Sequence, residues 1–250
     1  MNARRRAALP AGAAGDARDS VYPAREDTLL LRPFARSAAP ESRWLEIGTG
    51  NGVLALEAGR RGARVVATDL NPIALQRLRG DAARERLSVD CVRTDLAQGL
   101  GRFDGILANP PYLPTTVAER DRDRWHNLAT DGGPDGLRTA ARIVRSLPRH
   151  LRRGGVAYVL FSSLQDGRRR RAIRARWLGG GGWVRTVAER TMGGERLEVW
   201  ALGRRTATPP AGRGGRPPPG IDGRRRTRAD RPSGSSRGPA RGRTSARGGA

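Results

Sequence analysis

Strand-like and helix-like patterns alternate along the middle of this chain, between about residues 42 and 205. Apolar runs typical of buried strands are RWLEIG, ARVVATDL, LSVDCVRTDL, FDGILANPP and VAYVLFSSL, and a late strand, ERLEVWALG, follows WVRTVAER. Helical segments between them are GVLALEAGRRG, NPIALQRLRGDAARERL and GLRTAARIVRSLPRHLRRGG, the last expected to bend or end at Pro148. Strands that alternate with helices build a mostly parallel sheet with helices on both faces. The sequence therefore predicts an α/β protein with a doubly wound sheet.

The two ends of the chain differ from this middle part. After residue 205 the only large apolar residue is Ile221, and 11 arginines stand against two aspartates. Such a segment cannot bury enough surface to offset the entropy of ordering. We predict a flexible basic N-terminus over 1–19, one folded domain over 20–205, and a disordered Arg/Gly/Pro-rich tail over 206–250. The tail either contacts RNA or the ribosome non-specifically or is a functionally neutral extension.

Composition narrows the class of protein further. All 48 basic residues are arginine, and the formal charge of +24 favours polyanionic surroundings. The single cysteine, Cys91, excludes an intramolecular disulfide and is expected to be a buried thiol in a strand. His126 and His150 stand apart from other ligand types, so no metal site is expected. No apolar run approaches the ~18 residues of a spanning helix, and the N-terminus lacks a signal sequence. A soluble, cytoplasmic protein is expected.

A glycine-rich turn, EIGTGNG, follows the first strand. Gly48, Gly50 and Gly52 would let the backbone approach a ligand at the start of the next helix. A nicotinamide fingerprint reads G-x-G-x-x-G. Here the third glycine comes one residue early, and the acid Glu46 precedes the first. Taken alone, the turn fits a structural, a dinucleotide-binding or another nucleoside-binding role.

Two further acids stand at the ends of the next strands. Asp69 lies 21 residues after Gly48, a distance at which an acid can bind ribose hydroxyls. Asp95 ends the third strand, where its carboxylate would either accept from an exocyclic amine or cap a turn. Together with Glu46 these acids describe a site for a cationic nucleoside ligand without phosphates. The sequence therefore indicates S-adenosylmethionine (SAM) as cofactor.

The fourth strand ends in NPPY, residues 109–112. This tetrad resembles the [D/N]-P-P-[Y/F/W] signature of class I methyltransferases that act on planar nitrogens. The resemblance implies a Rossmann-like, mostly parallel seven-stranded sheet with an antiparallel late strand. It also implies that Asn109 and the Pro110 carbonyl accept hydrogen bonds from the target NH2 while Tyr112 packs on its flat face. The alternative is an Asn-Pro turn that merely terminates the strand.

Three other segments resemble the HemK family of protein glutamine methyltransferases. They are VYPAREDTLLL before the glycine turn, DGGPDGLRTAARIV after NPPY, and ERTMGGERLEVWAL near residue 200. Pro23, Ala24 and Arg25 depart from the family pattern, and Glu26 and Thr28 would be lid contacts. The resemblance implies cofactor contacts at Glu46, Gly48, Thr49, Gly50, Gly52, Asp69, Leu70, Asp95, Leu96, Asn109 and Thr28. It implies substrate contacts at Asn109, Pro110, Pro111 and Tyr112, of which Asn109, Pro110 and Tyr112 would be catalytic.

The same resemblance suggests a substrate and partners. The chain looks like the short form of the family, without an N-terminal helical docking domain, whose members methylate the glutamine of the release-factor Gly-Gly-Gln loop or, in one reading, lysine. Such members often need a small zinc-binding activator, for which the third strand, 87–92, could offer a free edge. Two other functions stay open: an N-methyltransferase of adenine or guanine in RNA or DNA, and a non-catalytic RNA-binding module.

Overall fold

The structure is a computed structural model that describes Val21 and residues 25–204 of the 250-residue chain. The described residues cover almost all of the predicted domain over 20–205. The flexible N-terminus predicted for 1–19 and the disordered tail predicted for 206–250 lie outside the described residues. The boundaries of all three segments therefore stay predictions.

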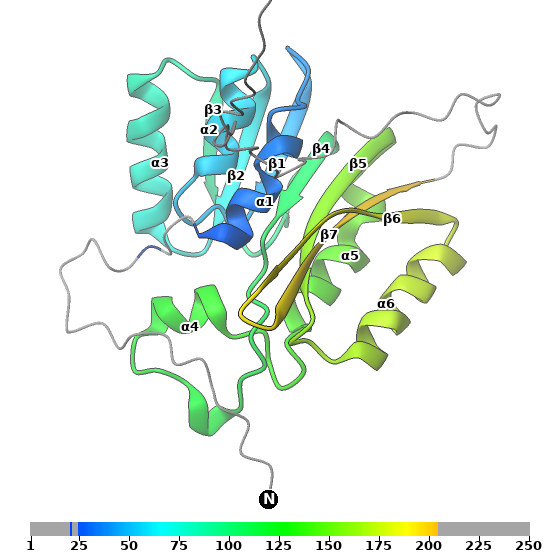
Figure 1. The fold of residues 1–250 in the computed structure, drawn as a ribbon. Helices are drawn as coiled ribbons and strands as arrows, with labels where there is room; N and C mark the ends of the chain where they lie inside the picture. The colour runs from blue at the N-terminus through cyan, green and yellow to red at the C-terminus, as the bar shows by residue number, and fades with distance from the viewer. Residues whose placement is uncertain (1–20, 22–24, 205–250) are drawn as a thin grey trace, which may run out of the picture. The chain divides into compact units, whose positions relative to one another are not determined.

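Seven strands form one sheet in the order β3-β2-β1-β4-β5-β7-β6 (Figure 1). The strands are β1 (Arg43–Ile47), β2 (Arg64–Asp69), β3 (Val89–Arg93), β4 (Phe103–Ala108), β5 (Leu151–Ser162), β6 (Gly182–Met192) and β7 (Glu195–Arg204). The pairs β1·β2, β1·β4, β2·β3 and β4·β5 are parallel. β7 runs antiparallel to both β5 and β6. The predicted class I methyltransferase sheet, including its antiparallel late strand, is confirmed.

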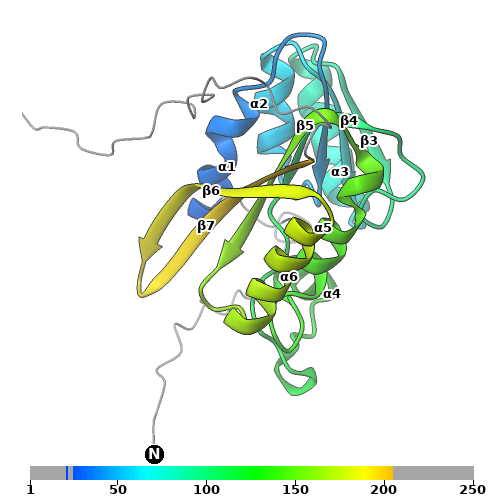
Figure 2. The ribbon, with the colours of Figure 1, turned by 90° about the vertical axis from the view of Figure 1, so that its right-hand side faces the viewer.

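The helices cover both faces of this sheet. They are α1 (Glu26–Ala35), α2 (Val53–Arg60), α3 (Pro72–Arg84), α4 (Arg124–Thr130), α5 (Arg138–His150) and α6 (Gly167–Gly179), with a 3-10 turn η2 (Val117–Glu119). Figure 2 shows α1 and α2 on one side of the sheet and α5 and α6 on the other. Among the described residues, no helix combines the length and the apolar character needed to cross a membrane.

Two hydrophobic cores follow from the alternation of side chains along each strand. In β1, Trp44 packs with α1, α2 and α3, whereas Leu45 and Ile47 pack with α5 and α6. In β4, Leu107 joins the first core and Ile106 the second. Because the central strands are buried on both faces, they read as continuous apolar runs in the sequence.

The structure corrects the boundary between the fifth strand and the helix before it. The sequence predicted a helix that reached residue 155 and a strand that began at 156, whereas α5 ends at His150 and β5 begins at Leu151. Leu151 pairs with Phe103, and the register then shifts before Gly105. Gly154, whose φ of +77° is unusual in a strand, interrupts the apolar pattern of β5, so the sequence did not indicate the early start. Pro148 does not end α5, because the helix continues for two residues after it.

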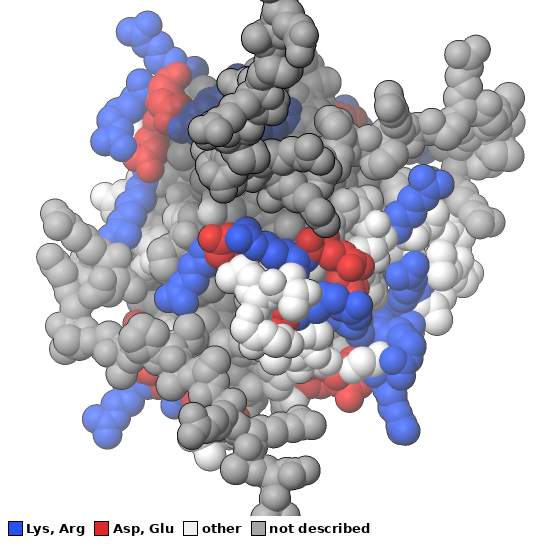
Figure 3. All heavy atoms as spheres, viewed as in Figure 1, with Lys and Arg blue, Asp and Glu red and all other residues white. Residues whose placement is uncertain are grey.

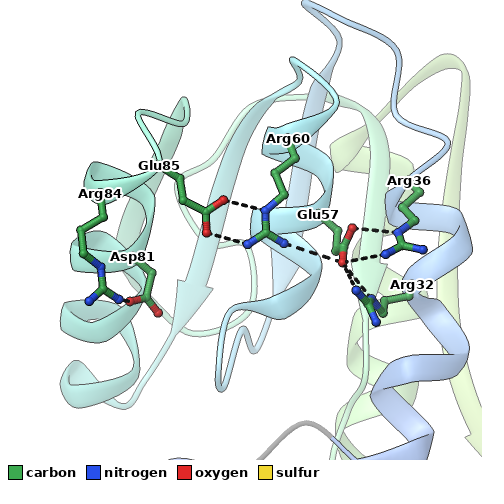
Figure 4. Close-up of polar contacts among 7 residues, drawn as sticks. All are labelled: Arg32, Arg36, Glu57, Arg60, Asp81, Arg84 and Glu85. Carbon is green, nitrogen blue, oxygen red and sulfur yellow. Dashed lines mark hydrogen bonds and ion pairs between the residues drawn. The ribbon is translucent and has the colours of Figure 1, made fainter.

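An ion-pair cluster joins α1, α2 and α3 (Figure 4). Glu57 of α2 is 5% exposed and accepts from Arg32 and Arg36 of α1. Hydrogen bonding to Arg36 is the largest cause that holds the pKa of Glu57 below its ordinary value. Arg60 also approaches Glu57 and donates to Glu85 after α3. The sequence had not predicted α1, and this cluster helps to hold α1 against α2.

Arginine side chains lie beside carboxylates over the face shown in Figure 3. Arg190 of β6 pairs with Glu26 of α1, and Arg169 of α6 pairs with Asp135. The carboxylates of these pairs are already counted in the formal net charge of +24. Ion pairs of this exposed kind contribute little to stability.

Candidate functional site

A pocket of about 650 Å³ lies at the carboxyl ends of the parallel strands. Ligands bind in this position in doubly wound sheets, at the point where the strand order reverses. The predicted site residues that line it are Glu26, Thr28, Glu46, Gly48, Thr49, Gly50, Asp69, Leu70, Asp95, Leu96, Asn109, Pro110, Pro111 and Tyr112. The fold therefore brings together segments from α1 to the end of β4.

The glycine turn presents its backbone to this pocket. Gly48 has φ +70°, and a Cβ at this residue would meet no atom within 4 Å, so a ligand can approach its backbone. Gly50 donates its N–H to Asp69 Oδ2 at 2.9 Å, which fixes the turn against the end of β2. Gly52 does not line the pocket. It has φ +78° at the N-terminus of α2, and a Cβ there would lie 2.6 Å from Leu78 Cδ1, so its role is to allow α2 to pack on α3.

Glu46 is a buried acid at the pocket wall, only 3% exposed. Its Oε2 accepts from the Thr49 hydroxyl at 2.7 Å and from Ala55 N–H at 2.9 Å. Burial raises the pKa of Glu46 to about 8, the two hydrogen bonds oppose this rise, and the charge of Asp69 adds to it. The side chain is therefore mostly neutral near pH 7, and a cation in the pocket would favour its ionised form.

The other two predicted acids differ in their surroundings. Asp69 accepts from backbone N–H groups on both oxygens, from Gly50 at 2.9 Å and from Asn71 at 2.8 Å. Its carboxylate is thus held in one orientation at the end of β2. Asp95 forms an ion pair of 2.5 Å with Arg142 of α5, a pocket residue that the sequence analysis missed. The next residue, Leu96, has φ +56°, so the chain turns sharply as it enters the pocket.

NPPY closes the pocket at the end of β4, opposite α1. Asn109 donates from Nδ2 to the Thr28 hydroxyl at 3.0 Å, whereas its Oδ1 is buried with no hydrogen-bond partner. A buried amide oxygen without a donor is costly in a folded protein. Tyr112 donates its hydroxyl to Asp27 Oδ2 at 3.3 Å. Asp27 is 4% exposed and was missed, because no strand end or spacing singles it out.

The Gly-Gly-x-x-Gly segment packs directly on NPPY. Gly136 has φ +72°, and a Cβ there would lie 2.4 Å from the Tyr112 carbonyl oxygen. A Cβ at Gly132 would lie 2.7 Å from the Gly136 Cα and carbonyl oxygen. Only glycine allows these contacts, so this segment packs against the backbone of Tyr112 and helps to hold the tetrad in place. The loop between NPPY and this segment contains η2 and α4, and Trp125 of α4 lines the pocket.

Two exposed apolar side chains stand at the pocket wall on the side of β5 and the β6–β7 hairpin. Leu164 is 47% exposed and Met192 is 40% exposed. No local pattern marks them, because Leu164 lies in the turn after β5, Met192 is the last residue of β6, and the position of both depends on the sheet.

Cys91 lies on the edge strand β3 and is only partly buried, which corrects the expectation of a buried thiol. Burial raises the pKa of this thiol all the same. His150 contacts the Gly101 carbonyl at 3.2 Å and His126 is exposed. Over Val21 and 25–204, no three His, Cys, Asp or Glu side chains gather as metal ligands would.

The strand order and this pocket define a class I methyltransferase. The Methyltransferase small domain family matches residues 26–131, from α1 to the loop after NPPY. A putative protein N5-glutamine methyltransferase of Methanocaldococcus jannaschii is 37% identical over 146 residues, which are 58% of this chain and 73% of that protein. The chain belongs to the HemK family of methyltransferases.

Other relatives carry names from translation termination. The release factor glutamine methyltransferase of Deinococcus radiodurans is 42% identical over 133 residues, 51% of this chain and 47% of that protein. The chain thus spans about half the length of this bacterial relative. The E. cuniculi Mtq2–Trm112 complex, responsible for methylation of the eRF1 translation termination factor, includes a chain with 26% identity and a TM-score of 0.58. That match covers 74% of this chain and 99% of the other.

Proposed function

We propose that this protein is a SAM-dependent N-methyltransferase that acts on a protein glutamine, in the Gly-Gly-Gln loop of a release factor. The observation that carries the proposal is Asn109 Oδ1, a buried acceptor without a donor in a residue that lines the pocket. An incoming side-chain amide N–H would satisfy it. The names of the relatives support this choice of substrate.

The pocket residues fit SAM as the cofactor. Three carboxylates, Glu46, Asp69 and Asp95, face a cavity whose volume of about 650 Å³ suits a nucleoside with an amino-acid arm. Glu46 would face the positive charges of the ligand, Asp69 the ribose hydroxyls and Asp95 the adenine amine. Thr28, Thr49, Leu70 and Leu96 complete the wall, and the exposed backbone at Gly48 admits the ligand closely. When bound, SAM supplies a methyl group on a sulfonium, which is an electrophile.

The residues of NPPY would activate the amide nitrogen without removing its proton first. An amide nitrogen is a weak nucleophile because its lone pair is delocalised into the carbonyl. As the nitrogen becomes tetrahedral it gains positive charge, and Asn109 Oδ1 and the Pro110 carbonyl stabilise that charge through the N–H groups. Pro110 and Pro111 fix these acceptors before the substrate arrives. The ring of Tyr112 offers a flat surface for the planar amide.

The direct test is methyl transfer from labelled SAM to a purified release factor, followed by peptide mapping. Label is expected on the glutamine of the Gly-Gly-Gln loop. A release factor with that glutamine replaced by glutamate is the matched control, since it keeps the shape and removes the NH2. Label that persists in this control would refute glutamine as the target.

The nucleic-acid alternative rests on the same acceptor, because the exocyclic amine of adenine or guanine is also planar and donates N–H. Label found in RNA or DNA and absent from protein would establish it. The predicted RNA contact through the tail over 206–250 and the predicted cytoplasmic location stay predictions.

We also propose a small zinc-binding activator as a partner. The described edge of the sheet at β3 (Val89–Arg93) pairs only with β2, so its other side offers backbone groups for strand addition. The Mtq2 relative forms a complex with Trm112. Co-expression with such a subunit is expected to raise yield or activity. Cys91→Pro is expected to prevent binding if the edge is used, because the Cys91 backbone faces away from β2.

A further inference from the structure

Asp27 connects the two polar side chains of the NPPY tetrad. Its Oδ1 accepts from the Thr28 backbone N–H at 2.7 Å and from the Thr28 hydroxyl at 3.4 Å. Its Oδ2 accepts from the Tyr112 hydroxyl at 3.3 Å. Asp27 is 4% exposed and lines the pocket, although nothing in the proposed chemistry uses it directly. A carboxylate in these contacts can only accept hydrogen bonds.

This constraint gives the chain of hydrogen bonds one direction. Because the single Thr28 hydroxyl proton points to Asp27, the Thr28 oxygen is left to accept, and it accepts from Asn109 Nδ2 at 3.0 Å. The Asn109 amide therefore places its NH2 toward α1 and its oxygen toward the pocket. The opposite amide orientation would present an NH2 to the substrate NH2, and two donors repel each other.

We propose that Asp27 is a positioning residue that sets the orientation of the Asn109 amide through Thr28, so that an acceptor always faces the substrate nitrogen. This inference rests on the proposed function and deepens it. Asp27 acts on the substrate only through Asn109 and through the ring of Tyr112, whose hydroxyl it holds. It thus makes the site selective for N–H donors.

The substitution Asp27→Ala tests the direction of the chain. Asparagine would keep its oxygen toward the Thr28 N–H, whereas alanine removes the acceptor, so the Thr28 hydroxyl can then donate to a flipped Asn109. We expect kcat to fall on the order of 10- to 100-fold, less than for the removal of a preorganised hydrogen-bonding group, because Asn109 itself remains. The Kd for SAM is expected to stay within about twofold, since the change concerns substrate orientation.

A second background separates orientation from a general structural role. In Asn109→Asp the carboxylate presents an oxygen in either orientation, so adding Asp27→Ala is expected to cause no further loss. Asp104→Ala is the matched control for the loss of a carboxylate, because Asp104 pairs with Arg152 at the far end of β4. Equal losses from Asp27→Ala in both backgrounds, with a weaker Kd for SAM, would overturn the proposal.

A measurement without substrate keeps the inference separate from the proposed function. With selective 15N labelling of asparagine, the Asn109 side-chain NH2 is assigned by its loss in Asn109→Asp. In the wild type this NH2 is bonded to Thr28 and should exchange slowly with water, whereas in Asp27→Ala it should exchange at least several-fold faster. Equal exchange rates would overturn the assigned orientation even if methyl transfer occurs. If the wild type transfers no methyl to any release factor, the proposed function fails while the exchange data still decide the role of Asp27.

Discussion

The raised pKa of Glu46 predicts that SAM affinity depends on pH. In the free protein, burial keeps Glu46 neutral up to a pKa of about 8. The positive charges of SAM stabilise the ionised form, so binding lowers this pKa and releases a proton near pH 7. The sign follows directly: affinity rises with pH until Glu46 is already ionised in the free protein.

The magnitude comes from the fraction of free protein in which Glu46 is ionised. If binding requires the ionised form, the apparent Kd at pH 6 is about 90-fold weaker than at pH 9, given the pKa of about 8. Between pH 6 and 7 the change approaches tenfold. The substitution Glu46→Gln keeps an acceptor for Thr49 and Ala55 and removes the titration, so its affinity should vary much less.

Isothermal titration calorimetry in two buffers with different ionisation enthalpies measures both the affinity and the number of protons released. The titration of the ligand's own amino group is common to both proteins, so the difference between wild type and Glu46→Gln isolates Glu46. The reasoning is refuted if both proteins show the same pH dependence, or if the wild type releases no additional proton at pH 7.

Three further predictions concern stability. Gly52→Ala is expected to lower the free energy of unfolding by about 1–3 kcal/mol, because residue 52 has a φ of +78° and a Cβ there would contact Leu78. Gly80→Ala lies in an open helical position and should raise the free energy of unfolding by about 0.5–1 kcal/mol. The opposite order of stabilities in urea unfolding would contradict the packing. Glu57→Gln should lower the free energy of unfolding by about 1 kcal/mol at pH 7, a small value because its arginine partners are partly exposed. This loss should vanish as pH falls through the lowered pKa of Glu57. A loss that does not depend on pH in urea titrations would argue against the ion pairs. Glu46→Gln should stabilise the free protein by about 3 kcal/mol at pH 7. The pKa of Glu46 is raised to about 8 in the folded protein, so between its ordinary pKa and 8 the carboxyl ionises in the unfolded chain only, and each rise in pH favours unfolding. Equal thermal midpoints at pH 5 and 8 in both proteins would exclude this.

Local patterns were sufficient to predict the residues at strand ends. Gly48 and Asp69 each follow an apolar run, and the carboxyl ends of parallel strands meet at one edge of the sheet. NPPY breaks its strand in a way that few structural needs explain. These signals lie within a few residues of each strand, so one sequence contains them.

The missed residues depend on contacts between distant segments. Asp27 reaches Tyr112 across 85 residues, and Arg142 reaches Asp95 across 47. Such contacts exist only after α1 and α5 have packed on opposite faces of the sheet, and no periodicity records them. The early start of β5 was hidden for a local reason, since Gly154 and Gly155 interrupt the apolar pattern of that strand.

The most direct test of the central claim is a comparison of methyl transfer by the wild type and Asn109→Ala to a release factor carrying the Gly-Gly-Gln loop. If Asn109 Oδ1 accepts the substrate N–H, the single-turnover rate should fall on the order of 10²- to 10³-fold, while the Kd for SAM stays within about twofold. An Asn109→Ala protein that methylates the glutamine at the wild-type rate would contradict the account.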